Sequence, residues 1–417
     1  MTPLRSSFSP RRVLGVSVAA ALAAAGLVAP PALAGDPAAG GSGGPVEIAL
    51  PEPTGDHDIG TVELHLVDED RPDPWDDQGR PREIMANVWY PAEHVRGVPR
   101  APYLSAGVAD HLDRTSASVG IDPGDVDFAG ALSHAGVRAP VARGLRGAPV
   151  VVYSPGGGMS RAMGTTLVEE LAGSGYIVVT VDHTYQAPVQ LPDRFEPPAP
   201  RPDYAQVVSE RVADLRFVLD RLADAAGGGV RDAAGRGLPR GLGGAMDLSR
   251  TAMFGHSAGG FATAEAMLAD PRIRAGINMD GDMSPNYALE TDVRGTDRPF
   301  MLMGAGSNGD GDPHDLDHGL GWRGFTDRST GWKRAPYLPA GEHMGFTDFQ
   351  VVLPGIGRSL DLDEEAVAAA IGTADPERSL AAQRAYTTAF FDLHLRGEPT
   401  DLFDGPSPDH PGWEFRS

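Results

Sequence analysis

Arg250-Thr-Ala-Met-Phe-Gly-His-Ser-Ala-Gly-Gly-Phe261 is the stretch of sequence that decides the fold. An apolar, strand-like segment ends at Phe254, and a helix-like run, Phe261-Ala-Thr-Ala-Glu-Ala-Met-Leu-Ala269, follows it. Between them, Ser257 stands in a Gly-x-Ser-x-Gly pattern. The glycines leave room for a very tight turn, and the strain of that turn exposes the serine hydroxyl. The stretch predicts a nucleophile elbow with Ser257 as nucleophile; a structural serine in a tight turn is the alternative.

A second Gly-x-Ser-x-Gly pattern surrounds Ser42, in Gly40-Gly-Ser-Gly-Gly44. No strand-like segment leads into this serine and no helix-like segment leaves it. A run of glycine and serine without apolar periodicity is typical of a flexible linker. We therefore predict that residues 35–50 are a linker and that Ser42 has no catalytic role.

The N-terminus has the composition of a secretory signal peptide. Arg5, Arg11 and Arg12 form a basic region, the segment 13–28 is apolar and alanine-rich, and Ala32-Leu-Ala34 fits a cleavage site. A membrane anchor is the alternative, but prolines end the apolar run and it is weakly hydrophobic for a membrane span. We predict that residues 1–34 are a signal peptide of the Sec or twin-arginine type and that the protein is secreted, without stable membrane insertion.

The composition excludes several classes of function. The 417 residues contain no cysteine, so disulfides and thiolate chemistry are absent. The formal net charge of −22 disfavours nucleic acid and anionic membranes as partners. The length suits one large α/β domain, which we place at residues 51–417. We expect a monomer that acts on a small-molecule ester or lipid and needs no cofactor.

Strand-like and helix-like segments alternate along this domain. Two alternating segments, 59–67 and 84–90, come first and predict an antiparallel start to a sheet. Continuous β-branched runs, typical of strands buried on both faces, follow at 148–153 and 176–181. Further strands are predicted at 250–254, 273–279, 299–303 and 333–338, and helices at 161–172, 207–222, 261–269 and 377–395. The order predicts a mostly parallel sheet with helices on both faces, the α/β-hydrolase architecture, with residues 93–146 as loops and short helices.

A serine nucleophile needs a base, and in this fold the base is a histidine that follows the serine in the chain. Four histidines follow Ser257: His314, His318, His343 and His394. His394 falls inside the last helix, and His314 and His318 fall in an acidic, glycine-rich loop. His343 follows the last strand-like segment, where a loop returns over the carboxyl edge of the sheet, so we predict His343 as the base.

The acid that orients the base is expected at the end of a strand after Ser257. Asp280 ends the strand-like segment 273–279, and a strand end holds a side chain more rigidly than a glycine-rich loop does. Asp282, Asp310 and Asp312 are the alternatives. We predict Asp280. The run from Asp310 to His318 also offers oxygen ligands for a cation, but its spacing does not match an EF-hand loop, and we predict no metal site.

Two backbone N–H groups are expected to form the oxyanion hole. One belongs to Ala258, at the start of the helix after the nucleophile. The other belongs to the turn Ser154-Pro-Gly-Gly-Gly158, where we choose Gly157, with Gly158 or Met159 as alternatives. The candidates for a substrate pocket are Met159, His183, Tyr185, Trp322 and Trp332, and core packing is the alternative for each.

These motifs resemble the α/β-hydrolase family of plasma-type (isoform II) platelet-activating factor acetylhydrolases and its secreted bacterial relatives. The resemblance runs from about Pro53 to Arg396, and its carriers are 60–68, 87–91, 152–158, 255–260, 276–280 and 343–348. It implies that Asp280 is the acid and that His343, in a His-x-x-Phe-x-Asp context, is the base, with Gly157 and Ala258 as oxyanion donors.

Together the motifs predict a secreted, lipase-like serine carboxylesterase that cleaves ester bonds through an acyl-enzyme. Ser257 attacks the carbonyl, His343 transfers the proton and Asp280 holds the imidazole. An amidase or peptidase on the same scaffold, or a non-catalytic binding protein, is the alternative function.

Overall fold

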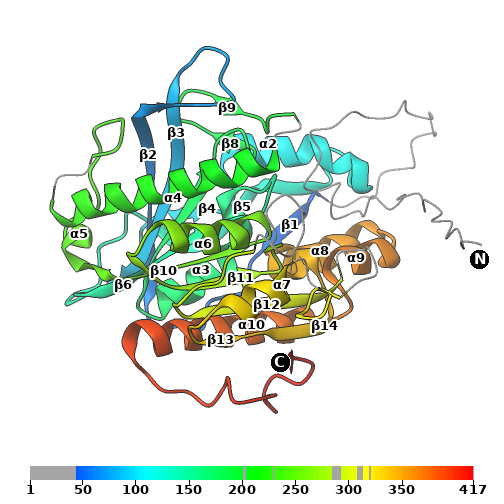
Figure 1. Ribbon diagram of the computed structural model, residues 1–417. Helices are drawn as coiled ribbons and strands as arrows, with labels where there is room; N and C mark the ends of the chain where they lie inside the picture. The colour runs from blue at the N-terminus through cyan, green and yellow to red at the C-terminus, as the bar shows by residue number, and fades with distance from the viewer. Residues whose placement is uncertain are drawn as a thin grey trace, which may run out of the picture.

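The computed structural model describes residues 44–200, 203–228, 231–283, 293–307, 313–318 and 321–416. These residues form a mixed sheet of thirteen strands with helices on both of its faces (Figure 1). This is the α/β-hydrolase architecture that the sequence predicts. The signal peptide, most of the linker with Ser42, and the alternative acids Asp310 and Asp312 lie outside the described residues.

One path through the sheet connects eleven strands by hydrogen bonds. In spatial order they are β1 (Val46–Ala49), β5 (Val126–Val137), β2 (Asp58–Pro72), β3 (Pro81–Ala92), β7 (Ile177–His183), β6 (Ala148–Ser154), β10 (Met246–His256), β11 (Ile273–Met279), β12 (Phe300–Ser307), β14 (Pro336–Glu342) and β15 (Glu414–Phe415). The short strand β4 (Arg100–Pro102) pairs with β5, and β13 (Lys333–Arg334) pairs with β12. A separate hairpin joins β8 (Val189–Gln190) and β9 (Phe195–Glu196).

The centre of the sheet is parallel, from β7 through β6, β10, β11 and β12 to β14. Every residue of β6 and of β7 is buried, as expected for β-branched runs that helices cover on both faces. The predicted antiparallel start is also present, because β2 pairs with β3 along nearly their whole length. Parallel strands put all their carboxyl ends at one edge, so the ends of β6, β10, β11 and β12 come together there.

Helices cover the sheet on both sides. On one face, α4 (Tyr204–Ala226), α6 (Ala258–Ala269) and α7 (Trp322–Arg328) contribute to one hydrophobic cluster, and α4 and α6 lie side by side (Figure 1). On the other face, α3 (Thr165–Gly173) and α10 (Pro376–Phe391) pack in a second cluster. The other described α-helices are α2 (Ala106–Thr115), α5 (Leu242–Ala245), α8 (Phe349–Leu360) and α9 (Glu364–Ile371). A short π-helix, Asp392–Arg396, continues α10 to about the predicted end of the last helix.

Two strands differ from what the sequence predicts. The expected linker 35–50 contains β1, which pairs in parallel with β5. The segment 93–146, expected as loops and short helices, contains the twelve-residue strand β5. Its sequence, Val-Asp-Phe-Ala-Gly-Ala-Leu-Ser-His-Ala-Gly-Val137, breaks the alternation of apolar and polar residues that marks a half-buried strand. Tertiary pairing with β1, β2 and β4 therefore decides its conformation.

Among the described residues, no helix combines the length and the hydropathy that crossing a membrane requires.

Candidate active site

Ser257 lies between the end of β10 and the start of α6, at the carboxyl edge of the sheet. Its backbone has φ 53° and ψ −123°, a conformation that non-glycine residues rarely adopt. The neighbouring structure holds it there, since its N–H donates to the carbonyl oxygen of Met279 at 2.9 Å. The side chain is partly exposed in a largely buried environment. These are the properties of the nucleophile elbow that the sequence predicts.

The two glycines that flank this turn are required by contact with the neighbouring backbone. A Cβ on Gly255 would lie 2.3 Å from the carbonyl carbon of Gly259, and a Cβ on Gly259 would lie 2.0 Å from the carbonyl oxygen of Ser154. Neither contact is tolerable, so only glycine lets β10, α6 and the end of β6 approach so closely.

Asp280 follows the last residue of β11 and points its carboxylate toward the next loops. Its backbone is also in the left-handed region, with φ 58°. The N–H of Ala305, on β12, donates to Oδ1 at 2.8 Å, and the side chain is completely buried. A buried carboxylate fixed by a backbone donor has a defined orientation, which is what an orienting acid needs.

His343 begins the short helix after β14, and its Nδ1 lies 2.5 Å from Oδ2 of Asp280. The imidazole remains partly exposed, at 15% of its side-chain surface. The structure thus brings together the predicted acid and the predicted base, which are 63 residues apart in the chain.

A second imidazole, that of His314, donates from Nδ1 to the same Oδ2 at 2.9 Å. Burial by itself would raise the pKa of the Asp280 carboxyl, but the charges and hydrogen bonds of His314 and His343 outweigh burial and hold that pKa below its usual range. The sequence placed His314 in a loop without a role. His314 lies in a loop away from the predicted strand ends, so the sequence gives no reason to expect its contact with Asp280.

Asp280, His314 and His343 also place three potential metal-ligand atoms within 4.8 Å of one another. Two ligands of a tetrahedral zinc ion, with bonds near 2 Å, lie about 3.3 Å apart. Both imidazole nitrogens are closer than that to the aspartate oxygen, at 2.5 and 2.9 Å. The arrangement therefore fits hydrogen bonds to a carboxylate better than the ligand set of a metal ion.

His256, the residue before the nucleophile, supports the backbone of the base. Its Nε2–H donates to the carbonyl oxygen of His343 at 2.9 Å, and the two rings lie 4.5 Å apart. Burial lowers the pKa of His256 to about 3, so the ring is neutral at physiological pH. This side chain occupies the variable position of the Gly-x-Ser-x-Gly pattern, and its role was not predicted.

The oxyanion donors are expected in the turn after β6 and at Ala258, the first residue of α6. The N–H of Gly158 donates to the carbonyl oxygen of Gln186 at 2.9 Å, and that of Met159 donates to Gly156 at 3.3 Å. Both alternatives to Gly157 are therefore already hydrogen-bonded. Among the described residues, no acceptor takes the N–H of Gly157 or of Ala258, and Gly157 is exposed.

The five pocket candidates lie in different environments. Met159 packs in a hydrophobic cluster that includes Met344, next to the base. Tyr185 is partly exposed, and its hydroxyl accepts from Arg80 at 2.9 Å. Trp322 is buried and donates from Nε1 to the carbonyl oxygen of Gly281, immediately after the acid, at 2.8 Å.

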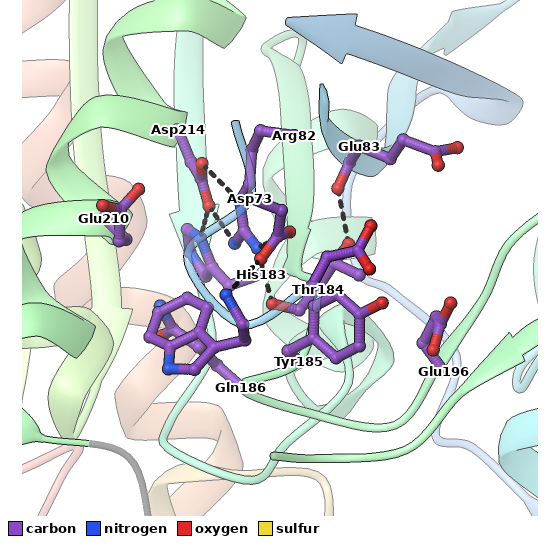
Figure 2. A network of polar contacts seen from close by, with 12 residues as sticks. Asp73, Arg82, Glu83, His183, Thr184, Tyr185, Gln186, Glu196, Glu210 and Asp214 are labelled. Atoms are coloured by element: carbon purple, nitrogen blue, oxygen red, sulfur yellow. Dashed lines mark hydrogen bonds and ion pairs between the residues drawn. The ribbon is translucent and has the colours of Figure 1, made fainter. Parts of the chain in front are cut away.

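His183 and Trp332 differ from their expected place in a pocket. His183 is buried in the polar network shown in Figure 2, between Asp214 and Ser154. Trp332 packs against Phe390 and Phe403, on the side of the sheet that α10 covers. The prediction that these two residues line a pocket rested on residue type alone. In the structure, both side chains instead contact the neighbours just named.

Asp348 links the loop of the base to the start of α3. Its carboxylate accepts from the N–H of Thr165 at 2.9 Å and from the N–H and hydroxyl of Thr166 at 3.1 and 2.6 Å. Burial raises the pKa of Asp348 to about 6, against these hydrogen bonds. The last residue of the His-x-x-Phe-x-Asp motif is thus a structural anchor for the segment that begins at His343.

Comparison with known proteins agrees with this geometry. No family model matches the chain. A probable 1-alkyl-2-acetylglycerophosphocholine esterase of Arthroderma benhamiae is 27% identical over 391 residues, which cover 88% of this chain and 93% of that protein. A solved structure, the ferulic acid esterase of Streptomyces cinnamoneus, is 38% identical and covers 90% of this chain and 100% of its own, with a TM-score of 0.72.

The chain belongs to the α/β-hydrolase esterases, since it is 38% identical to the ferulic acid esterase over most of both chains. The resemblance seen in the sequence is confirmed, and so is the prediction of a carboxylic ester hydrolase. Both relatives are matched along most of their length, so the similarity extends well beyond the serine motif. The candidate site lies where the strands β6, β10, β11 and β12 end.

Proposed function

We propose that this esterase hydrolyses its substrate through an acyl-enzyme on Ser257, with His343 as the general base and Asp280 as the orienting acid. The observation that carries the proposal is the 2.5 Å contact between Asp280 Oδ2 and His343 Nδ1. Ser257 lies in a strained, partly exposed turn, and its N–H binds the carbonyl oxygen of Met279, the residue before Asp280. Serine, histidine and aspartate occur in the chain order expected for this fold.

The contact with Asp280 sets the tautomer of the base. An ionised carboxylate accepts only, so His343 carries its proton on Nδ1 and its Nε2 is free to accept the proton of the serine hydroxyl. As Ser257 attacks the ester carbonyl, the imidazole becomes positively charged and the Asp280 carboxylate stabilises that charge. The lowered pKa of Asp280 keeps the carboxylate ionised throughout the neutral range.

The N–H groups of Gly157 and Ala258 stabilise the oxyanion of the tetrahedral intermediate. Ala258 is the first residue of α6, where the free N–H groups and the helix dipole favour negative charge. Collapse of the intermediate transfers the proton from His343 Nε2 to the leaving alcohol and leaves the acyl group on the serine. Water, activated by the same imidazole, then releases the acid and restores the hydroxyl.

The substrate is an ester of an acyl group on an alcohol, and the relatives suggest which esters to test first. One is named for the acetyl ester of an alkylglycerophosphocholine, the other for esters of ferulic acid. We propose both classes of ester as candidate substrates of this chain, and we add p-nitrophenyl esters from acetate to decanoate to the panel.

The decisive experiment compares the wild type with Ser257→Ala on this ester panel. We expect the variant to lose at least about three orders of magnitude in kcat, because the nucleophile is gone and only binding and oxyanion stabilisation remain. Ser42→Ala is the matched control, since it changes the other Gly-x-Ser-x-Gly serine, and it should keep full activity. Esterase activity that survives in Ser257→Ala would refute the proposed nucleophile.

We also propose that the enzyme is exported, on the strength of the basic and apolar segments within residues 1–34. Expression of the full chain in a bacterial host should release protein into the medium or periplasm. N-terminal sequencing of that protein should begin at Gly35. Retention of an uncleaved chain in the cytoplasm would contradict export.

A further inference from the structure

Arg211 binds the turn from Pro155 to Gly158, here called the oxyanion turn because it bears the proposed donor Gly157, and it does so from the core of the protein. The residue comes from α4 and is completely buried. Its Nη1 donates to the carbonyl oxygen of Pro155, and its Nη2 donates to that of Gly156 at 3.1 Å. One planar guanidinium thus holds two consecutive carbonyl groups of the turn.

The guanidinium of Arg211 differs from the two others nearby. Arg71 and Arg82 pair directly with the Asp214 carboxylate, as Figure 2 shows for Arg82. Arg211 instead directs its N–H groups to uncharged oxygens, including Gln186 Oε1 at 2.7 Å. Burial lowers the pKa of Arg211 to about 10, which still leaves it charged at neutral pH. A positive charge is therefore held against the turn that bears the oxyanion donor.

The geometry of the peptide bond determines where the donors point. No peptide bond of the described residues is cis, and in a planar trans peptide the C=O and N–H vectors are antiparallel. Because Arg211 binds the carbonyl oxygen of Gly156, the N–H of Gly157 points away from the guanidinium, out of the core. A cation on the carbonyl oxygen also polarises the amide and makes its N–H a stronger donor.

A buried chain of hydrogen bonds fixes Arg211 itself. Asp214, three residues later on the same face of α4, accepts from His183 Nδ1 at 2.9 Å (Figure 2). The other ring nitrogen, Nε2, is then an acceptor and takes the hydroxyl proton of Ser154 at 2.9 Å. The hydroxyl oxygen in turn accepts from Arg211 Nη1 at 3.3 Å. Every donor in this chain points the same way, so the position of the guanidinium is defined.

Gln186 closes the network on the other side of the turn. Its side chain accepts from Arg211, and its backbone carbonyl oxygen accepts the N–H of Gly158. The turn from Pro155 to Gly158 is held at both ends, and the Gly157 N–H between them stays available.

We propose that Arg211 is a positioning residue for the oxyanion hole: it orients the Gly157 N–H and strengthens it as a donor during ester hydrolysis. This inference rests on the proposed serine mechanism and names a residue that the mechanism does not otherwise use.

The test compares Arg211→Lys and Arg211→Met with the wild type. Lysine keeps the charge but cannot bind two carbonyl groups with a planar fork, and methionine keeps approximate size without charge. Arg216→Met is the matched control, because it removes an exposed arginine from the same helix. The substrate is p-nitrophenyl acetate, and the second readout is the Ki of an aryl trifluoromethyl ketone, which forms a hemiketal oxyanion on the serine.

We expect kcat to fall about tenfold in Arg211→Lys and about 100-fold in Arg211→Met, with little change in KM, because loss of a whole oxyanion donor costs about 100- to 1000-fold. The Ki of the ketone should rise by the same factors. Ki does not depend on the fraction of active enzyme, so partial unfolding alone would leave it unchanged and it can be measured on any residual activity.

A Ki within about twofold of the wild type in both variants would overturn the role of Arg211, whatever happens to kcat. Failure of the underlying mechanism would look different. In that case the ketone would not inhibit the wild type, and Ser257→Ala would keep its activity.

Discussion

At the residue scale, the Asp280 carboxylate has the most consequential contacts in the molecule. One oxygen accepts from two imidazoles and the other from the N–H of Ala305. The two imidazoles have different roles in the proposed mechanism, because His343 is the base and His314 only supports the acid through its hydrogen bond to Oδ2. We therefore expect their loss, and the loss of the acid, to have different consequences.

Asp280→Asn should reduce kcat by about four orders of magnitude on p-nitrophenyl acetate. The asparagine amide is nearly isosteric, but its NH₂ group can turn toward His343 Nδ1 and favour the tautomer in which Nε2 carries the proton. That nitrogen can then no longer accept the proton of the serine hydroxyl. The measurement is steady-state kinetics, with a melting curve to show that the variant is folded.

His314→Phe is the companion variant, since it keeps a ring of similar size but removes the N–H. We expect kcat to fall by less than about tenfold, because His343 and the N–H of Ala305 still hold the carboxylate. A loss as large as that of Asp280→Asn would show that His314 has a larger part in the reaction than that of a supporting donor.

The sequence predicts roles for Ser257, Asp280 and His343 because their positions relative to strands follow from chain order. It gives no role to His314, His256 or Arg211. Their partners are set by where loops and a helix pack in three dimensions, and neither residue type nor spacing encodes that. His183 is a prediction that residue type alone made wrongly. A histidine suggested a pocket residue, but in the structure the side chain is buried in the core.

At the scale of elements, the elbow is the place where β6, β10 and α6 come closest. Gly259→Ala should lower the free energy of unfolding by about 1–3 kcal/mol or more, because its Cβ would overlap the carbonyl oxygen of Ser154, a backbone atom that cannot rotate away. Activity should fall as well, since the elbow or the oxyanion turn must shift. Urea denaturation and kinetics on the same preparation test both effects.

Gly244→Ala is the matched control for that change. No atom lies within 4 Å of a Cβ at this position in α5, and its φ is not positive. Stability should stay the same or rise slightly, since alanine has the higher helix propensity. Equal losses in both variants would mean that the close approach at the elbow is not what requires glycine.

Strands that are buried on both faces are easier to predict from the sequence than strands that are only partly buried. The central strands β6, β7 and β11 are covered on both faces, so they are continuous apolar runs that the sequence displays directly. The outer strands β1 and β5 are only partly buried and rich in small or polar residues, and their pairing partners are distant in sequence. Local pattern carries too little information there, and the strands are formed by the sheet they join.

At the scale of the whole molecule, the chain combines a net charge of −22 with histidines that are buried and neutral. Burial lowers the pKa of His183 to about 4 and that of His256 to about 3. The unfolded chain binds protons at these residues near pH 6.5, whereas the folded chain does not until the pH is far lower. Folding is therefore opposed by protonation across the interval between those values.

We expect the free energy of unfolding to be highest above pH 6.5 and to fall as the pH drops toward 4. Each of the two histidines contributes a slope of up to about 1.4 kcal/mol per pH unit in that window. Two further groups act in the same window. The pKa of Asp348, raised to about 6 by burial, opposes this slope below pH 6, whereas His394, whose pKa burial lowers to about 4, adds to it. Relief of repulsion between free carboxylates begins only near pH 4, so a net loss of stability is expected between pH 6.5 and 5. Urea denaturation at pH 7, 6 and 5 measures the slope.

His183→Asn separates this cause from general acid sensitivity. The variant will be less stable at every pH because it breaks the bonds to Ser154 and Asp214, so the absolute stability is not the test. The test is the slope, which should decrease by up to about 1.4 kcal/mol per pH unit once the His183 imidazole is gone. If the slope stayed the same, protonation of the buried network would not be what makes the fold sensitive to acid, and the neutral state of His183 would have to be reconsidered.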